Sequence, residues 1–179
     1  VTIHNGVFTI IDLVAMKSTR VPDYQKTIPN PLPNGSFLGV AFAKDSKTVY
    51  LSGGDNGAVI VYDIERFTKL DSISLNTTVN GVQYNDSFTS DLLLNEDSDE
   101  LLVLDRANFR LVRIALNLRS ITASVNVGRQ PFGLALSPDR QTAFVANVGM
   151  YSYPLISGAT PANYDSMMIP WHPYGNGTK

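Results

Sequence analysis

Residues 127–147, VGRQPFGLALSPDRQTAFVAN, contain two short apolar runs separated by a Ser-Pro-Asp turn. A related stretch, GVAFAKDSKTVYLSG at 39–53, has the same order of Gly, alternating apolar run, turn around an Asp and second apolar run. A weaker copy, DLLLNEDSDELLVLD, occupies 91–105. Self-similarity of this kind indicates a repeat architecture. We therefore interpret residues 127–147 as one copy of a structural unit and not as a catalytic signature.

A second pattern completes the repeat. GAVIVYDIERFTKLDSISL at 57–75 matches NFRLVRIALNLRSITASVNV at 108–127 and GVFTIIDLVAMKSTRV at 6–21, which aligns Asp12 with Asp63. Val, Ile, Leu, Tyr and Phe dominate these runs, and Gly, Asp, Asn, Ser or Pro separates them, as is typical of short strands. Four strands per repeat are predicted: a at 38–43, 91–95 and 132–137; b at 48–52, 100–105 and 142–147; c at 7–13, 58–64 and 109–116; d at about 24–28, 69–75 and 119–127.

A repeat of about forty residues with four strands is typical of a β-propeller blade. Strand d is the most polar of the four, as expected of an outer edge whose Lys and Arg residues discourage pairing with other chains. The sequence thus predicts an all-β fold of four-stranded antiparallel blades. The chain is expected to hold the end of one blade in 1–28, complete blades in 29–75 and 76–127, the start of another in 128–147, and a long b–c insertion in 148–179.

This arrangement amounts to about three blades, which is fewer than the four to eight blades of a closed ring. Both ends would then expose the apolar face of a blade, and soluble monomers rarely expose patches of that size. We expect the remaining blades to come from a larger protein or from a pairing chain.

Residues 131–147 resemble the YVTN-type repeat of surface-layer and YncE-like propellers, P-x-G-[VL]-A-[VL]-S-P-D-G-x-x-[AV]-[YF]-V-[TA]-N, with Arg140 in place of the Gly after Asp139. The longer stretch 127–161 resembles bacterial proteins in which a YncE-like propeller precedes an alkaline-phosphatase-superfamily phosphoesterase domain. The resemblance implies a secreted or periplasmic phosphoesterase-type protein, whose metal ligands and nucleophile lie in a domain after this chain. We expect its complete ring to have seven blades.

Composition excludes several functions. The net charge of −2 and the pI near 5.6 argue against binding of nucleic acid, which needs clustered Lys and Arg. The chain has no cysteine, so disulfides, thiolate metal sites and a Cys nucleophile are excluded. No apolar run reaches the length of a membrane span. These features suit an extracytoplasmic β-protein, and no cofactor is expected.

Two sequence features resemble metal sites. In NEDSDE, Asn95, Asp97 and Asp99 have the alternating spacing of a calcium loop, but Glu100 stands where such a loop needs Gly. The repeat accounts for the same residues as an acidic a–b turn, which we favour. The histidines, His4 and His172, are too few for a metal site unless carboxylates join them, and we expect structural roles.

The topology of a propeller predicts where a ligand binds. The d–a and b–c connections lie together on one face, and function is usually carried by such loops. Arginines at these loops could hold an anionic group, and the insertion adds aromatic side chains. The predicted ligand-binding residues are Arg106, Arg129, Asn147, Tyr151, Trp171 and His172.

Three functions remain open from the sequence. The first is a non-catalytic segment for ligand or protein binding or scaffolding, beside a phosphoesterase domain. The second is a propeller enzyme of the lactonase type, for which Asp55, Asn80 and Asp105 would have to converge as metal ligands. The third is a surface-layer or adhesion module. No catalytic residue and no metal ligand is predicted for the first, which we favour.

Overall fold

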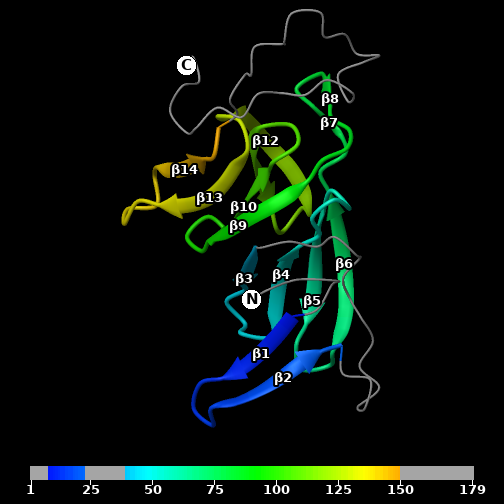
Figure 1. The fold of residues 1–179 in the computed structure, drawn as a ribbon, viewed down its shortest axis with the longest axis vertical. Coiled ribbons are helices and arrows are strands. Elements are labelled where there is room, and N and C mark those ends of the chain that lie inside the picture. Colours follow the sequence, from blue (N-terminus) through cyan, green and yellow to red (C-terminus); the bar gives the residue numbers. More distant parts are fainter. Residues whose placement is uncertain (1–7, 23–38, 150–179) are drawn as a thin grey trace, which may run out of the picture. The chain divides into compact units, whose positions relative to one another are not determined.

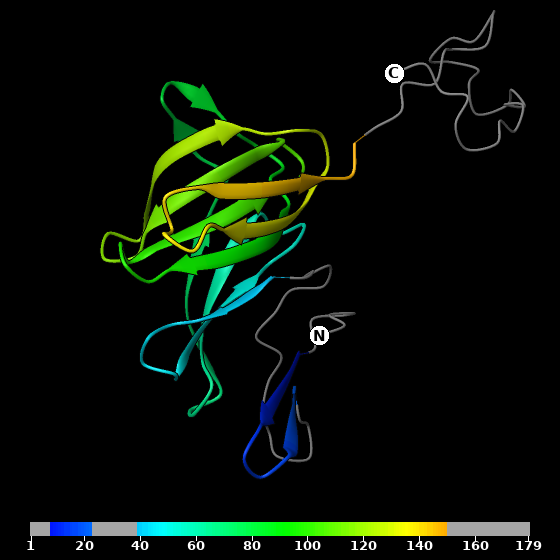
Figure 2. The same cartoon turned by 90° about the vertical axis from the view of Figure 1, so that its left-hand side faces the viewer.

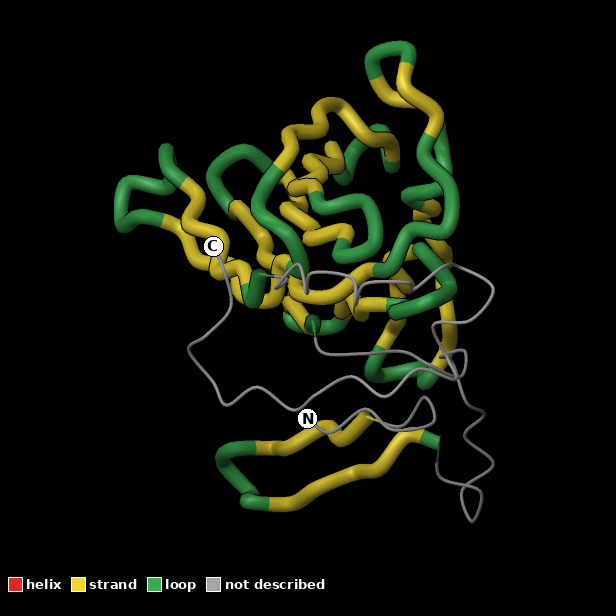
Figure 3. Tube along the Cα trace, turned by 45° about the horizontal axis from the view of Figure 1, so that its top comes forward, coloured by secondary structure: helices red, strands yellow, loops and turns green. Residues whose placement is uncertain are grey.

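The computed structural model describes residues 8–22 and 39–149. Its described part consists of β-strands, turns and loops, without a helix, which confirms the predicted all-β class (Figure 3). No membrane-spanning helix is found among these residues. The chain divides into two compact units, Val1–Val148 and Gly149–Lys179, and everything below except Gly149 belongs to the first unit. The predicted insertion at 148–179 lies outside the described residues from residue 150 onward.

Two four-stranded antiparallel sheets form the body of the fold, each with its strands side by side in chain order (Figure 1). The first is fully buried at its third strand, as expected when both faces of a sheet are covered, and largely exposed at its fourth, the outer edge. The strands are β3 (Val40–Phe42), β4 (Thr48–Ser52), β5 (Ala58–Asp63) and β6 (Thr68–Ser74) in the first sheet, and β9 (Thr89–Asn95), β10 (Glu100–Asp105), β11 (Arg110–Ala115) and β12 (Ser120–Asn126) in the second.

Three two-stranded hairpins accompany the sheets within the described ranges. One precedes the first sheet, one follows the second, and a small one lies in the connection between them. They are β1 (Phe8–Asp12) with β2 (Lys17–Val21), β13 (Pro131–Leu136) with β14 (Ala143–Asn147), and β7 (Thr78–Val79) with β8 (Val82–Gln83).

One strand position was predicted wrongly. The d strand expected at about 24–28 lies outside the described residues, and the strand that pairs with β1 is β2 at Lys17–Val21. The reason is a tight turn after β1. The carboxylate of Asp12 accepts hydrogen bonds from the backbone N–H groups of Val14 and Ala15, and Met16 has a φ of 48°. This closes the hairpin with a short turn, as Asp63 does after β5.

Apolar side chains fill the space on both faces of the first sheet. A smaller cluster on one face contains Phe8 and Val21 of the β1–β2 hairpin together with Leu51 and Tyr62, and the rings of Phe8 and Tyr62 meet edge to face at 5.2 Å. The cluster on the other face joins the two sheets. Its buried members are Tyr50, Val59, Val61, Ile73, Leu75, Leu92, Leu101, Val103, Val112 and Ile114.

The first strands of successive four-stranded repeats, β3, β9 and β13, lie next to one another. The backbone N–H of Gly39, just before β3, donates to the carbonyl of Ser90 on β9 at 3.0 Å. A Cβ atom at Gly39 would lie 2.7 Å from that carbonyl oxygen, so this approach needs glycine. On the other side of β9, Asp91 accepts a hydrogen bond from the N–H of Leu134 on β13 at 2.9 Å. Figure 2 shows the β13–β14 hairpin, in yellow and orange, beside this sheet.

Aspartates that accept hydrogen bonds make stability sensitive to acid. The hydrogen bond from the backbone N–H of Thr48 is the largest cause that lowers the pKa of Asp45, and a hydroxyl hydrogen bond from Ser137 likewise lowers the pKa of Asp139. Such carboxylates stabilise the fold above their unfolded pKa of 3.8, and the contribution is lost as the pH falls through the lower folded pKa. Among the described residues, the aspartates with a lowered pKa are Asp45, Asp63, Asp71 and Asp139.

We therefore expect the free energy of unfolding to decrease steadily below about pH 5. Urea denaturation at a series of pH values measures it. The Asp45→Asn variant should show a shallower decrease, because its amide cannot take up the proton. If the free energy of unfolding of this variant falls with pH as steeply as that of the unaltered chain, the lowered pKa of Asp45 is not a source of the acid sensitivity.

Candidate functional site

The b–c turns and the d–a connections lie at one edge of the sheets, as the strand order requires and as predicted. Gly54 in a b–c turn forms a β-bridge with Thr89, and the N–H of Arg106 donates to the carbonyl of Phe88 at 2.7 Å. We call this edge the loop edge. Among the described residues it consists of 53–57, 76–88, 105–109, 128–130 and 148. The a–b turn with Ser137 and Asp139 lies at the opposite edge, where both residues bond within the turn.

A buried ion pair anchors the loop edge. Nε of Arg110 lies 2.8 Å from Oδ2 of Asp105, and neither side chain is accessible to solvent. The guanidinium also donates to the carbonyl of Leu75 at 2.7 Å, and its central carbon lies 3.5 Å from the centre of the Tyr84 ring. Arg110 thereby joins the start of β11 to both ends of the connection between the two sheets.

Asp105 and Asn108 extend this anchor to the loop that precedes β9. Oδ1 of Asp105 accepts hydrogen bonds from the backbone N–H groups of Phe88 and Asn108 at 3.1 and 3.3 Å. The amide nitrogen of Asn108 donates to Oδ2 of Asp105 and to the carbonyl of Asn85. It also donates to the hydroxyl of Ser87 at 3.2 Å. These bonds fix the backbone on both sides of Arg106 and Phe88.

Arg106 is held in place from two directions. Its Nε donates to Oε1 of Gln130, which belongs to the next d–a connection. Its guanidinium carbon lies 5.8 Å from the centre of the Phe88 ring, a cation–π contact. Because Arg106 is only half-buried, part of the side chain still reaches solvent. The loop edge thus presents a cation whose direction is set before any ligand arrives.

Two more predicted residues lie in the same neighbourhood. Arg129 is exposed and directly precedes Gln130, which has a φ of 54°. Asn147 packs against Gly128, where an added Cβ would lie 2.6 Å from its Cγ. The structure therefore brings Arg106, Arg129 and Asn147 to one part of the loop edge. The other predicted site residues, Tyr151, Trp171 and His172, lie outside the described residues, as does His4.

The residues that orient Arg106 were not predicted from the sequence. Gln130 and Phe88 carry no charge and belong to loops, so no periodic signal marked them. Arg110 did carry a signal, because it is the first residue of β11 and corresponds in the repeat to Ala58, the first residue of β5. A charged residue at a position that is apolar in a sister repeat points to a buried partner of opposite charge.

The residues required for a lactonase-type site do not form one in the described structure. Asp105 is fully buried and paired with Arg110, so its carboxylate is not available to a metal ion. Asp55 is exposed in a b–c turn, and Asn80 lies at the exposed tip of the β7–β8 hairpin. Within residues 8–22 and 39–149, no three His, Cys, Asp or Glu side chains gather as metal ligands. The acidic stretch 96–99 is the turn between β9 and β10.

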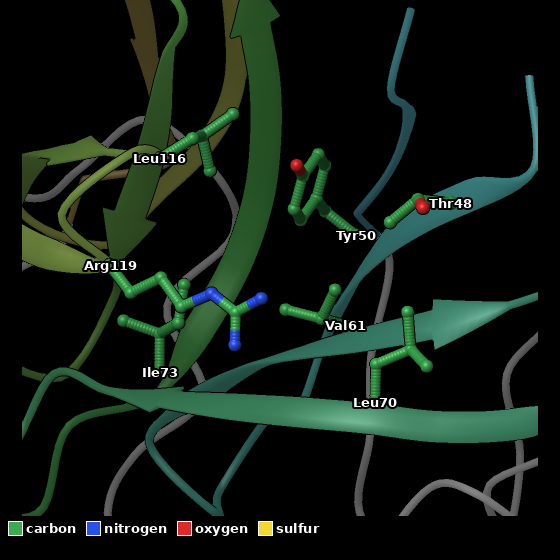
Figure 4. A pocket seen from close by; sticks show the side chains of 7 residues that line it. All are labelled: Thr48, Tyr50, Val61, Leu70, Ile73, Leu116 and Arg119. Atoms are coloured by element: carbon green, nitrogen blue, oxygen red, sulfur yellow. The ribbon is translucent and has the colours of Figure 1, made fainter. Parts of the chain in front are cut away.

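A pocket of about 170 Å³ lies between the two sheets (Figure 4). Its lining combines four aliphatic side chains with the Thr48 hydroxyl, the Tyr50 phenol and the Arg119 guanidinium as polar groups. Burial raises the pKa of Tyr50, and Asp99 and Asp45 raise it further. Arg119 is paired with Asp71 at 2.6 Å, so the charge of the pocket is already balanced. The lining residues are Thr48, Tyr50, Val61, Leu70, Ile73, Leu116 and Arg119.

No protein-family model and no curated protein matches the chain. Many chains of solved structures do match in their fold. One is "Kuenenia stuttgartiensis Hydrazine Synthase", with a TM-score of 0.54 and 19% sequence identity, over 66% of this chain and 30% of that chain. At this identity the likeness concerns the fold alone. This chain spans less than a third of that protein chain's length.

Proposed function

We propose that this chain is a segment of a β-propeller that binds an anionic group of a ligand or protein at its loop edge, without being a catalyst itself. The repeat of four strands, the two sheets with strands in chain order and the contact between β3, β9 and β13 support the propeller arrangement. Each four-stranded sheet is then one blade, and the loop edge is the face that carries the binding site.

The observation that carries the binding proposal is the fixed position of Arg106. Gln130 and Phe88 hold its side chain, and Arg129 lies one residue from Gln130. Two arginines on neighbouring loops of one edge favour oxyanions, because each guanidinium can donate charge-assisted hydrogen bonds to carboxylate or phosphate oxygens. A side chain that is ordered before binding loses little conformational entropy when the ligand arrives.

Titration calorimetry with inorganic phosphate at low salt tests the proposal. We expect the Arg106→Ala/Arg129→Ala double variant to bind phosphate at least ~10-fold more weakly, which corresponds to about 1.4 kcal/mol. Arg66→Ala is the matched control, because Arg66 is an exposed arginine at the opposite edge of the first sheet. Equal binding by the double variant, or no binding by the unaltered chain, would overturn the proposal.

For the whole protein we propose a phosphoesterase-type enzyme outside the cytoplasm, with this chain as its binding or scaffolding part and seven blades in the full ring. The support is the resemblance of residues 127–161 to propellers that precede phosphoesterase domains.

An assay with bis(p-nitrophenyl) phosphate is expected to show hydrolysis by the full gene product and none by this chain. A full gene product without hydrolysis, made only of further repeats, would favour a surface-layer or adhesion module. The burial of Asp105 counts against the lactonase type.

A further inference from the structure

The pocket between the two sheets has no part in the binding site proposed above. Thr48 directly follows the a–b turn of the first sheet, and Arg119 belongs to the turn between β11 and β12. Both turns lie at the edge opposite the loop edge, so the pocket is separate from Arg106 and Arg129. Its walls come from two complete four-stranded sheets that follow one another in the chain.

Aliphatic side chains give the pocket the size and the walls of a site for a small apolar group. Val61 and Ile73 of the first sheet and Leu116 of the second line about 170 Å³ of space (Figure 4). An apolar cavity of about 150 Å³ is enough to bind benzene. The pocket therefore has room for one six-membered ring.

A β-bulge brings a further leucine to the rim of the pocket. The register of β5 with β6 shifts between Val61 and Tyr62, which leaves Leu70 as an extra residue on β6. Leu70 lines the pocket and is 49% exposed. Bulges redirect side chains and are frequent next to functional sites. Here the bulge gives the rim an apolar surface that a bound ring can cover.

Tyr50 supplies a hydrogen-bond donor that lacks an acceptor. It lines the pocket at 9% exposure, and its phenol makes no hydrogen bond to any of the described residues. Because burial raises the pKa of Tyr50, the O–H stays protonated at neutral pH. A buried hydroxyl without a partner costs free energy, and a ligand oxygen that accepts from it would recover that cost.

The charges around the pocket favour a neutral ligand. The guanidinium of Arg119 is paired with Asp71 at 2.6 Å, across the two sheets. Asp99 and Asp45 lie near enough to Tyr50 to raise its pKa further. An anion would be repelled by these carboxylates, and a cation would be repelled by Arg119.

We propose that this pocket binds a small neutral molecule that combines one six-membered ring with one hydrogen-bond acceptor, such as a carbonyl oxygen. The ring lies among Val61, Ile73 and Leu116, with Leu70 at its outer side. The acceptor receives the O–H of Tyr50. This site is additional to the anion site at the loop edge, and neither depends on the other.

NMR titration of the isotope-labelled chain with two probes tests the role of Tyr50. Cyclohexanone carries the ring and the acceptor, and benzene carries a ring alone. We expect cyclohexanone to bind with a dissociation constant of about 1 mM and to shift the amide signals of Tyr50, Val61 and Leu116 most. Tyr50→Phe should bind cyclohexanone about 5-fold more weakly, because one hydrogen bond is lost, and benzene as before. Unchanged binding of cyclohexanone, or an equal loss for both probes, would overturn the role of Tyr50.

Leu70→Trp tests the pocket itself. The larger side chain at the rim should fill the space and weaken the binding of both probes at least ~10-fold. Leu118→Trp is the matched control, because Leu118 is 67% exposed in the turn between β11 and β12 and does not line the pocket. Circular dichroism verifies that both variants fold. The inference is wrong if neither probe shifts these signals in the unaltered chain, or if both variants weaken binding equally.

Discussion

Replacing Arg110 by methionine is expected to lower the free energy of unfolding by about 3–5 kcal/mol, because it leaves the buried carboxylate of Asp105 without its partner. Arg110 and Asp105 are both inaccessible to solvent, so water cannot replace the lost interaction. The variant also removes the hydrogen bond to the carbonyl of Leu75 and the contact with the Tyr84 ring. Urea denaturation followed by circular dichroism measures the loss.

Two further variants separate the buried charge from general damage. Arg113→Met lies on the same strand, and its partially exposed pair with Glu100 at 3.4 Å predicts a loss of at most about 1 kcal/mol. The Arg110→Met/Asp105→Asn double variant should recover part of the stability, because no charge stays buried and the amide oxygen can still accept from the N–H of Phe88. If the double variant is less stable than Arg110→Met alone, the unpaired charge is not the cause.

Leu101→Ala is expected to cost about 2–5 kcal/mol, the usual range for a leucine truncated in a well-packed core. Leu101 lies on the second strand of its sheet, opposite Ile114 on β11 and Leu94 on β9, and is fully buried in the cluster that joins the two sheets. Neighbours on two strands and on the facing sheet cannot all move to fill the cavity. Urea denaturation measures the loss in free energy of unfolding. The dependence of that free energy on urea concentration is compared between Leu101→Ala and the unaltered chain.

Leu118→Ala is the matched control for this variant. Leu118 is 67% exposed in a turn, so the same truncation there should change stability by less than about 0.5 kcal/mol. A comparable loss at both positions would mean that the two sheets are not joined by a packed core.

Local patterns were enough to predict most strands. Apolar runs of period two and Asp-containing turns are properties of neighbouring residues, and Asp12, Asp63 and Asp139 do bond to backbone N–H groups in the turns where the repeat places them. The predicted position of the strand after β1 was wrong. It relied on the alignment of the polar outer strands, which is a weaker signal than the turn at Asp12. A capped short turn fixes where the next strand begins.

The site was predictable only in outline. The order of strands in an antiparallel sheet determines which loops share an edge, so Arg106, Arg129 and Asn147 could be assigned to one face without a structure. What each side chain does there depends on loops that are distant in the sequence. Arg106 bonds to Gln130, 24 residues away, and no pattern within one repeat contains that contact.

The sequence by itself thus determined the all-β class, the turns and the edge at which the b–c turns and d–a connections lie together, because these follow from short-range periodicity and chain order. Only the tertiary structure decided that Asp105 forms a buried ion pair with Arg110. It also decided that Gln130 orients Arg106, and that the side chains of Phe144 and Val40 are exposed. Burial, ion pairing and the covering of sheet faces are set by the packing of whole units against one another. A residue's own neighbours along the chain do not specify that packing.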